Sequence, residues 1–245
     1  MSELYDLLGH SYAVQRQADP RISVAIRHQL QGRTYIVNVG AGTGSYEPID
    51  LPVVAVEPSS QMILQRRNRS NVVQAKAEAL PFVDGAFDAA MAILTVHHWN
   101  DKERGLKECA RAARNRLVIF TWDPASEGFW LVQDYFPELL VLDRRIFPSM
   151  EYLRSMLGRI SVQTVAVPAD CIDGFLGAYW RRPRAYLDPV VRSGMSSFAR
   201  ISEVESRIEL LRKDLASGAW ERSHRHLLVA DTLDIGYRLV TVELQ

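Results

Sequence analysis

One short segment constrains the fold of this chain more than any other. Residues 35–39 read Tyr-Ile-Val-Asn-Val, an apolar and β-branched run that is typical of a buried parallel strand. Gly40, Gly42 and Gly44 follow it directly. Glycines at alternate positions leave one face of the turn without Cβ atoms, so the backbone can approach a ligand closely. A strand that ends in such a loop predicts an α/β fold that binds a nucleoside or a nucleotide.

The spacing of these glycines separates three kinds of nucleotide site. A dinucleotide-binding loop has the pattern G-x-G-x-x-G/A, whereas here the third glycine is Gly44 and Ser45 follows it. A phosphate-binding P-loop is a poorer match, because no Gly-Lys-Ser/Thr follows the glycines. Glu57 ends the next apolar run, and beside the loop its carboxylate can accept both hydroxyls of a ribose. These features favour a nucleoside without a pyrophosphate, with an NAD-dependent oxidoreductase as the weaker alternative.

The rest of the first half alternates between strands and helices. Apolar residues at helical spacing predict two helices within residues 4–30, the second with Asp19 as its N-cap and Pro20 at its first position. Because helical stretches separate five apolar runs, a parallel, doubly wound sheet is expected. The five runs are residues 35–39, 53–57, 72–75, 87–94 and 117–122. Further strands are predicted at 161–167 and 235–244, on either side of a long, mainly helical stretch.

The composition favours a small-molecule partner. The chain carries 29 basic and 29 acidic residues, so its bulk electrostatics favour neither nucleic acid nor an anionic membrane. Cys109 and Cys171 are far apart and lack the spacing of metal ligands, so neither a metal site nor a disulfide is expected, and a cytoplasmic location is the default. The first eight residues have no signal-peptide pattern, and no apolar run approaches the roughly 18 residues of a membrane helix.

Four ordered motifs between residues 35 and 122 resemble the class I S-adenosylmethionine-dependent methyltransferases. They are Val-Asn-Val-Gly-Ala-Gly-Thr-Gly, Ala-Val-Glu-Pro-Ser, Ala-Glu-Ala-Leu-Pro-Phe-Val-Asp-Gly-Ala-Phe-Asp and Leu-Thr-Val-His-His-Trp. The sequence is most similar to the small-molecule subgroup typified by the ubiquinone and menaquinone C-methyltransferases (methyltransferase type 11). This resemblance implies a seven-stranded Rossmann-like sheet, S-adenosylmethionine as the cofactor and methyl transfer to a small molecule.

The resemblance also implies one domain over residues 1–245, divided into five parts. In the resembled fold the last two strands form an antiparallel hairpin, so residues 161–167 and 235–244 are expected side by side. The parts are an N-terminal helical cover (1–32), a cofactor-binding core (33–123), a segment with the sixth strand (124–169), a helical lid insertion (170–230) and a closing strand (231–245).

The same resemblance implies a cofactor site, motif by motif. The loop would approach the methionine and ribose portions, Glu57 would bind the ribose hydroxyls, and the backbone of Leu94 would face the methionyl amino group. Two departures from the family pattern are Lys76, where many relatives carry an acidic residue, and Asn38, where an Asp is common. The implied set is Gly40, Ala41, Gly42 and Gly44 in the loop, Glu57, Pro58 and Met62 after the second strand, Ala77 and Glu78 at the adenine edge, and Leu94.

Residues that contact the acceptor are expected beyond the fourth strand. His97 is the candidate general base, because imidazole ionises near neutral pH, and His98, the more structural of the two, is a candidate substrate contact. In the lid, Phe175, Tyr179 and Trp180 either stack on a planar acceptor or pack the core of the insertion.

The N-terminal segment offers a further contact with the cofactor. Tyr12 and Arg16 lie one helical turn apart and are predicted to close over the cofactor's carboxylate. Methyl transfer has no obligatory catalytic residue, so a catalytically silent protein that binds S-adenosylmethionine or S-adenosylhomocysteine stays an alternative. The identity of the acceptor, the atom that is methylated and the oligomeric state stay open.

Overall fold

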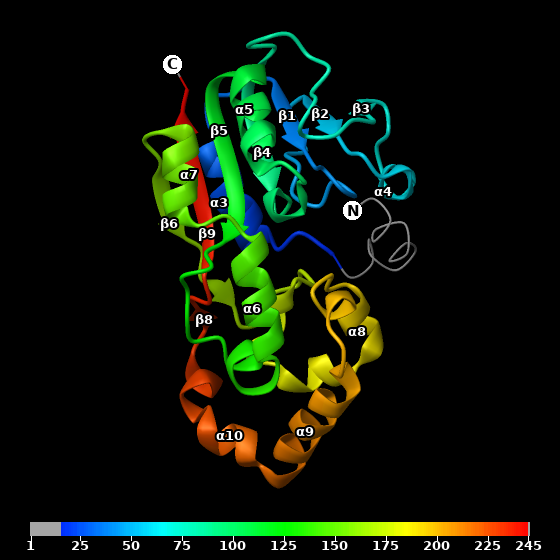
Figure 1. The fold of residues 1–245 in the computed structure, drawn as a ribbon, viewed down its shortest axis with the longest axis vertical. Helices are drawn as coiled ribbons and strands as arrows, with labels where there is room; N and C mark the ends of the chain where they lie inside the picture. Colours follow the sequence, from blue (N-terminus) through cyan, green and yellow to red (C-terminus); the bar gives the residue numbers. More distant parts are fainter. Residues whose placement is uncertain (1–15, 245) are drawn as a thin grey trace.

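The computed structural model of the protein describes residues 16–244. A seven-stranded sheet with the order β3-β2-β1-β4-β5-β9-β6 forms its framework (Figure 1). Strands β1 to β5 pair in parallel, whereas β9 is antiparallel to both β5 and β6. The sheet confirms the predicted fold class. Its strands are β1 (Ile36–Val39), β2 (Val53–Val56), β3 (Val72–Val73), β4 (Phe87–Ile93), β5 (Ala113–Trp122), β6 (Ser161–Thr164) and β9 (Tyr237–Glu243).

Side chains at the N-termini of the helices explain where they begin. Helix α3 (Pro20–Gln29) starts after Asp19, whose carboxylate accepts a hydrogen bond of 3.0 Å from the Arg21 backbone N–H. This confirms the predicted N-cap and the proline at the first position. The earlier predicted helix falls largely outside the described residues. Ser59 and Asp101 cap α4 (Ser60–Leu64) and α5 (Lys102–Ala112) in the same way.

Alternate residues of the central strand β4 supply two apolar cores, one on each face of the sheet. Ala89 and Met91 pack in the cluster that contains Ile22 and Ile26 of α3. Ala90 and Ala92 pack in the other cluster, which contains Leu106 and Cys109 of α5 and Leu153 of α7 (Met150–Leu157). Because both faces are covered, the carboxyl ends of the parallel strands are left as the edge where a ligand site can form.

Of the segments after β5, α7 and the strands β6 and β9 lie at the sheet, whereas most of the others gather beyond one end of it (Figure 1). They include a π-helical turn (Leu131–Tyr135), α6 (Pro137–Ile146), α8 (Pro189–Ser193), α9 (Val204–Ser217) and α10 (Ala219–Ser223). None of the helices in residues 16–244 is both long and apolar enough to cross a membrane.

The predicted strand at 161–167 is divided between two sheets, which corrects its expected length. Residues Ser161–Thr164 pair with β9 as expected. Val167–Pro168 (β7) pairs instead with Thr232–Leu233 (β8), in a separate two-stranded sheet. This small sheet joins the two ends of the insertion, because β7 precedes it and β8 follows it.

Candidate functional site

Each glycine of the loop has a positive φ, but the three have different surroundings. A Cβ on Gly40 (φ +70°) would lie 2.0 Å from Thr95 Oγ1, so this glycine permits β1 and the end of β4 to approach each other. A Cβ on Gly42 (φ +52°) would meet no atom within 4 Å. At Gly44 (φ +87°) it would crowd the side chains behind the loop, 3.0 Å from Glu47 Oε2. The bare face at Gly42 is therefore the one that opens toward a ligand.

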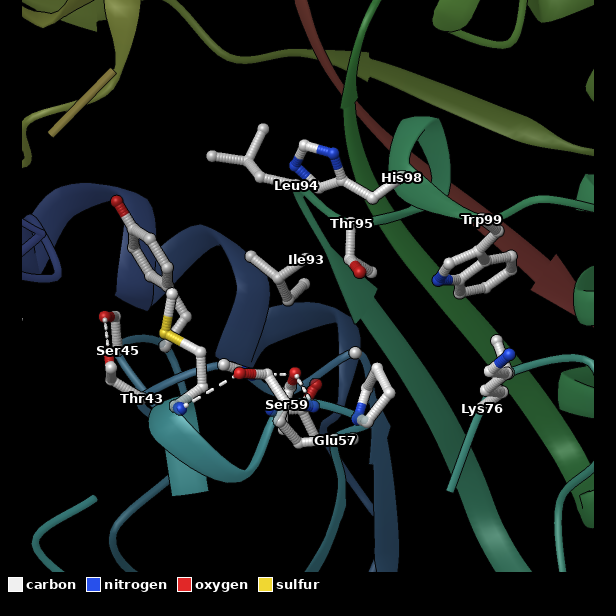
Figure 2. Close-up of a pocket in the computed structure, with 18 of the residues that line it drawn as sticks. Thr43, Ser45, Glu57, Ser59, Lys76, Ile93, Leu94, Thr95, His98 and Trp99 are labelled. Carbon is white, nitrogen blue, oxygen red and sulfur yellow. Dashed lines mark hydrogen bonds between the residues drawn. The ribbon is translucent and has the colours of Figure 1, made fainter. Parts of the chain in front are cut away.

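A cavity of about 1170 Å³, open to solvent, lies against this loop (Figure 2). It runs from Glu57 and Ser59 at one end to Leu94 and His98 at the other (Figure 2). Of the predicted cofactor residues, the structure brings to its wall Gly40, Ala41, Gly42, Glu57, Pro58, Met62, Ala77, Glu78, Leu94 and Arg16. Gly44 is not in the lining, and Tyr12 lies outside the described residues. Sequence reasoning missed Thr43, Ser45, Tyr46, Ser59, Thr95, Trp99 and Asn100, which also line it.

Glu57 is buried at the cavity wall and holds two segments together. Its Oε2 accepts a hydrogen bond of 2.8 Å from the Gly42 backbone N–H, and its Oε1 accepts one of 2.9 Å from that of Ser59. A carboxylate oxygen can accept more than one hydrogen bond, so this geometry leaves acceptor capacity for ribose hydroxyls. Together with the bare face of Gly42, the arrangement fits a nucleoside.

The back of the glycine loop rests on a buried ion pair that the sequence did not suggest. Arg66 Nη2 lies 2.5 Å from Glu47 Oε2, and Arg66 Nη1 donates a hydrogen bond of 3.0 Å to the Gly42 carbonyl. Glu47 also accepts a hydrogen bond of 2.9 Å from the amide of Asn38. A carboxylate therefore reaches Asn38 from the next loop, at the position where the resembled family commonly has Asp.

The chain turns sharply at the end of β4. Leu94 has φ +51°, an uncommon value for a branched residue, and its N–H donates a hydrogen bond of 2.7 Å to the Phe120 carbonyl. This turn places Leu94 in the wall of the first cavity and also of a second one.

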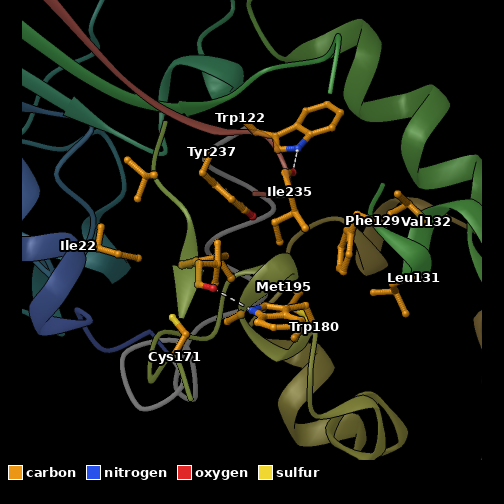
Figure 3. Packing of buried hydrophobic residues seen from close by; sticks show 14 of the residues in the cluster. Ile22, Trp122, Phe129, Leu131, Val132, Cys171, Trp180, Met195, Ile235 and Tyr237 are labelled. Carbon is orange, nitrogen blue, oxygen red and sulfur yellow. Dashed lines mark hydrogen bonds between the residues drawn. The ribbon is translucent and has the colours of Figure 1, made fainter. Parts of the chain in front are cut away.

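The second cavity, of about 690 Å³, adjoins the first on the side of the insertion. Arg16, Leu94 and His98 line both cavities. The remaining wall is mainly aromatic and aliphatic, and Figure 3 shows part of it where β5 and β9 meet the insertion. It includes Trp122, Phe129, Val132, Leu140, Phe147, Phe175, Leu176, Met195, Ile235 and Tyr237.

Comparison with known proteins identifies the family. Residues 37–119 match the family model described as a methyltransferase domain. A solved structure from Anabaena variabilis, described as a "Putative methyltransferase from antibiotic biosynthesis pathway", is 34% identical with a TM-score of 0.86, covering 94% of this chain and 99% of that one. This chain belongs to the S-adenosylmethionine-dependent methyltransferases. S-adenosylmethionine is therefore the cofactor of this family, and the NAD alternative is set aside, while the placement of the cofactor in the first cavity stays a prediction.

Curated relatives match only about half of this methyltransferase. The "Probable tRNA methyltransferase 9B" of Mus musculus is 32% identical over 117 residues, which cover 44% of this chain and 26% of the relative. A 2-methyl-6-phytyl-1,4-hydroquinone methyltransferase of Oryza sativa subsp. japonica is 25% identical over 143 residues, 54% of this chain and 42% of the relative. The match thus spans about a quarter of the length of the first of these relatives.

The two histidines of the methyltransferase occupy different positions. His97 lines only the second cavity, where its ring stacks on Phe147 with 3.9 Å between centroids, and its Nδ1 has no hydrogen-bond partner among the described residues. His98 lines both cavities, with its Nδ1 3.2 Å from Arg200 Nη2. Burial lowers the pKa of His97 well below its usual value and that of His98 to about 3. Both imidazoles are therefore neutral at physiological pH. His98 lies at the junction of the two cavities and His97 in the second cavity alone, and their predicted roles stay predictions.

Two of the three predicted lid aromatics are packing residues. Phe175 lines the second cavity. Trp180 is fully buried and donates a hydrogen bond of 2.9 Å from Nε1 to the Val167 carbonyl, so it packs the insertion instead of facing an acceptor. Tyr179 lines neither cavity. The Arg182 Cζ lies over the Tyr179 ring, 4.6 Å from the centroid of that ring. The packing interpretation therefore holds for Tyr179 and Trp180.

Arg16 connects the N-terminal segment to the insertion. Its Nε lies 2.6 Å from Oδ1 of Asp173, a fully buried carboxylate that also accepts a hydrogen bond of 2.8 Å from the Tyr46 hydroxyl. The guanidinium lines both cavities while it holds this ion pair. Its contact with a cofactor carboxylate stays a prediction.

Asp143 is a lining residue of the second cavity that sequence reasoning missed. It lies near the end of α6 and is only 6% exposed. Burial raises its pKa to about 7, against the opposing charge of Arg200. The sequence signal was a single acidic residue after an apolar segment, a pattern that is far more common on a solvated helix face.

Proposed function

We propose that this methyltransferase transfers the methyl group of S-adenosylmethionine to a small-molecule acceptor held in the second cavity. One observation carries the proposal: the cofactor cavity and an apolar cavity share a wall formed by Arg16, Leu94 and His98. Methyl transfer needs the donor and the acceptor in adjoining sites, and this junction supplies that adjacency.

The chain's own residues would bind and orient the two reactants. Glu57 and the face at Gly42 would hold the nucleoside, while Pro58 and Met62 would flank its base and Ala77 and Glu78 its edge. Bound S-adenosylmethionine supplies an electrophilic methyl group on a sulfonium. The aromatic wall of the second cavity would exclude water from the acceptor.

Three observations favour a small molecule over tRNA. The formal charge of the chain is zero, whereas RNA binding by a phosphate-contacting surface favours a basic protein. The similarity to the tRNA methyltransferase of Mus musculus covers only 44% of this chain. The similarity to the antibiotic-pathway protein covers 94%, including the insertion that lines the second cavity, and thus supports a biosynthetic small molecule as the acceptor.

Transfer of label from methyl-labelled S-adenosylmethionine tests this function. Wild-type protein is incubated with a panel of small aromatic and aliphatic alcohols, amines and quinols, and separately with total tRNA. Label is expected in a small molecule and not in tRNA. Label only in tRNA would contradict the acceptor class, and binding of S-adenosylhomocysteine without any transfer would favour the catalytically silent alternative.

A matched pair of variants ties this activity to the cofactor site. Glu57→Gln removes the charge that faces the ribose, so S-adenosylhomocysteine should bind more weakly by about 1 to 3 kcal/mol in calorimetry. Asp231→Asn changes an acidic side chain that is fully exposed, so it should leave the affinity unchanged. Equal affinities in the two variants would show that Glu57 does not hold the nucleoside.

A further inference from the structure

Asp143 differs from the other buried aspartates in the described part of the chain. Asp19 accepts hydrogen bonds from Arg21 and from the Ile172 backbone, and Asp173 is paired with Arg16 and Tyr46. Asp143 Oδ1 is buried and has no hydrogen-bond partner among residues 16–244. Leaving a buried carboxyl oxygen unpaired costs folding free energy. Its position in the wall of the second cavity therefore indicates a partner that comes from a ligand.

A second unpaired polar atom lines the same cavity. His97 Nδ1 is buried without a partner among the described residues, and its ring is held by stacking on Phe147. The wall also contains Arg16, His98, Ser196 and Ser197, but among its described residues Asp143 Oδ1 and His97 Nδ1 are the buried side-chain atoms without a hydrogen-bond partner. These two atoms are therefore the polar positions that a ligand can satisfy.

The aromatic side chains define the shape of such a ligand. Trp122 packs edge-on against Phe147 with 5.5 Å between ring centroids, and Phe175 lies 4.6 Å from Tyr237. Flat rings on several sides favour a planar, largely apolar molecule. Trp122 is fixed by a hydrogen bond of 2.8 Å from its Nε1 to the Ile235 carbonyl, so its ring position is built into the fold (Figure 3).

The charges around Asp143 indicate whether the polar group of the ligand is a neutral hydroxyl or an ammonium ion. Arg200 acts on Asp143 electrostatically, and Arg16, although paired with Asp173, lines the cavity. The other titratable groups that face this space, the imidazoles of His97 and His98 and the phenol of Tyr237, are neutral at physiological pH. Nearby guanidinium groups oppose an ammonium ion and tolerate a neutral hydroxyl.

We infer that Asp143 forms a hydrogen bond with the hydroxyl group of a planar, otherwise apolar acceptor, and that His97 is the second polar contact. This inference rests on the proposed function and names the substrate class of the same site. Asp143 acts here as a binding and specificity residue that contacts the acceptor directly.

Binding of three matched probes to protein saturated with S-adenosylhomocysteine tests the inference by calorimetry at about pH 8. The probes are 2-naphthol, naphthalene and 2-naphthylmethylamine, which share a ring system and differ in the polar group. Wild-type protein should bind 2-naphthol about 10-fold more tightly than naphthalene. The ammonium probe should gain nothing over naphthalene.

Two substitutions assign this preference to Asp143. Asp143→Leu should abolish the preference for the hydroxyl, and Asp143→Asn, whose amide oxygen still accepts a hydrogen bond, should retain about 3-fold. If Asp143→Leu does not fold, Asp143→Asn carries the test alone. Asp231→Asn, on the exposed surface, should keep the full 10-fold preference.

Four results would overturn the inference: no binding of any probe to the wild type, a preference for the ammonium, a preference for the hydroxyl that survives Asp143→Leu, or a full preference in Asp143→Asn. Because the protein is first saturated with S-adenosylhomocysteine, a failure of the inference about Asp143 can be distinguished from a failure of the proposed function. Loss of S-adenosylhomocysteine binding would refute the cofactor site, whereas intact cofactor binding without hydroxyl selectivity would refute only the role of Asp143.

Discussion

At the scale of single residues, Asp143 makes the stability of the protein depend on pH. Burial raises its pKa from an ordinary 3.8 to about 7 in the folded protein. Between these values the folded state holds a proton that the unfolded state has released. The stability that the neutral carboxyl supports is thus fully present below about pH 4 and is lost as the pH rises through 7.

The variant Asp143→Asn should remove this dependence. A difference of about 3 pKa units corresponds to roughly 4 kcal/mol of unfolding free energy between about pH 4 and pH 8. Urea denaturation of both proteins across this range should therefore show the variant gaining on the wild type as the pH rises. Parallel stability curves would mean that Asp143 titrates normally in the folded state.

Single residues also show what the sequence could not reveal. The residues around the first cavity come from local motifs, so the position of Glu57 after the second strand and the family resemblance for Pro58 and Met62 were enough to predict that they line it. Asp143 and the two histidines meet only in the folded chain. Whether His97 or His98 faces the junction depends on the 3-10 turn Val96–His98 and on the ring of Phe147, neither of which leaves a pattern in the sequence.

At the scale of elements, caps and apolar runs predicted the sheet and the helices around it. Asp19 and Pro20 marked the start of α3 correctly, because each acts through local geometry. The predicted strand at 161–167 was too long, because alternation alone cannot show where Val167 leaves β9 for β8. Trp180 lies on an aromatic segment whose buried side was decided by tertiary packing.

The ion pair between Arg66 and Glu47 supports the glycine loop from behind. Arg66 follows α4, where the sequence indicates only a favourable charge at the end of a helix. In the structure the Arg66 side chain is only 5% exposed and forms an ion pair with Glu47. Arg66→Met should leave Glu47 without its cation and lower the unfolding free energy by about 3 kcal/mol. The affinity for S-adenosylhomocysteine should fall as well, because Arg66 also holds the Gly42 carbonyl.

An exposed ion pair on α9 provides the control for this experiment. Arg212 and Glu209 are each 53% exposed, so Arg212→Met should leave both stability and cofactor affinity nearly unchanged. Urea denaturation and calorimetry measure the two quantities. Equal losses of stability and cofactor affinity in Arg66→Met and Arg212→Met would show that the Arg66–Glu47 ion pair does not support the glycine loop.

At the scale of the whole molecule, the site depends on two parts of the chain that meet along one edge of the sheet. The core supplies the first cavity, and the segments after β5 supply most of the second. Arg16, Asp173 and Tyr46 tie these parts together through a buried ion pair and hydrogen bond. The donor side could be predicted because it lies within one run of motifs, whereas the acceptor side required the three-dimensional arrangement.

A crystal structure of the protein with S-adenosylhomocysteine would show whether the donor occupies the first cavity with its sulfur facing the second. The ribose is expected within hydrogen-bond distance of Glu57, and the sulfur at the wall of Leu94 and His98, facing the second cavity. A sulfur atom that points away from this wall, or a nucleoside bound elsewhere, would contradict the proposed placement of donor and acceptor in adjoining cavities.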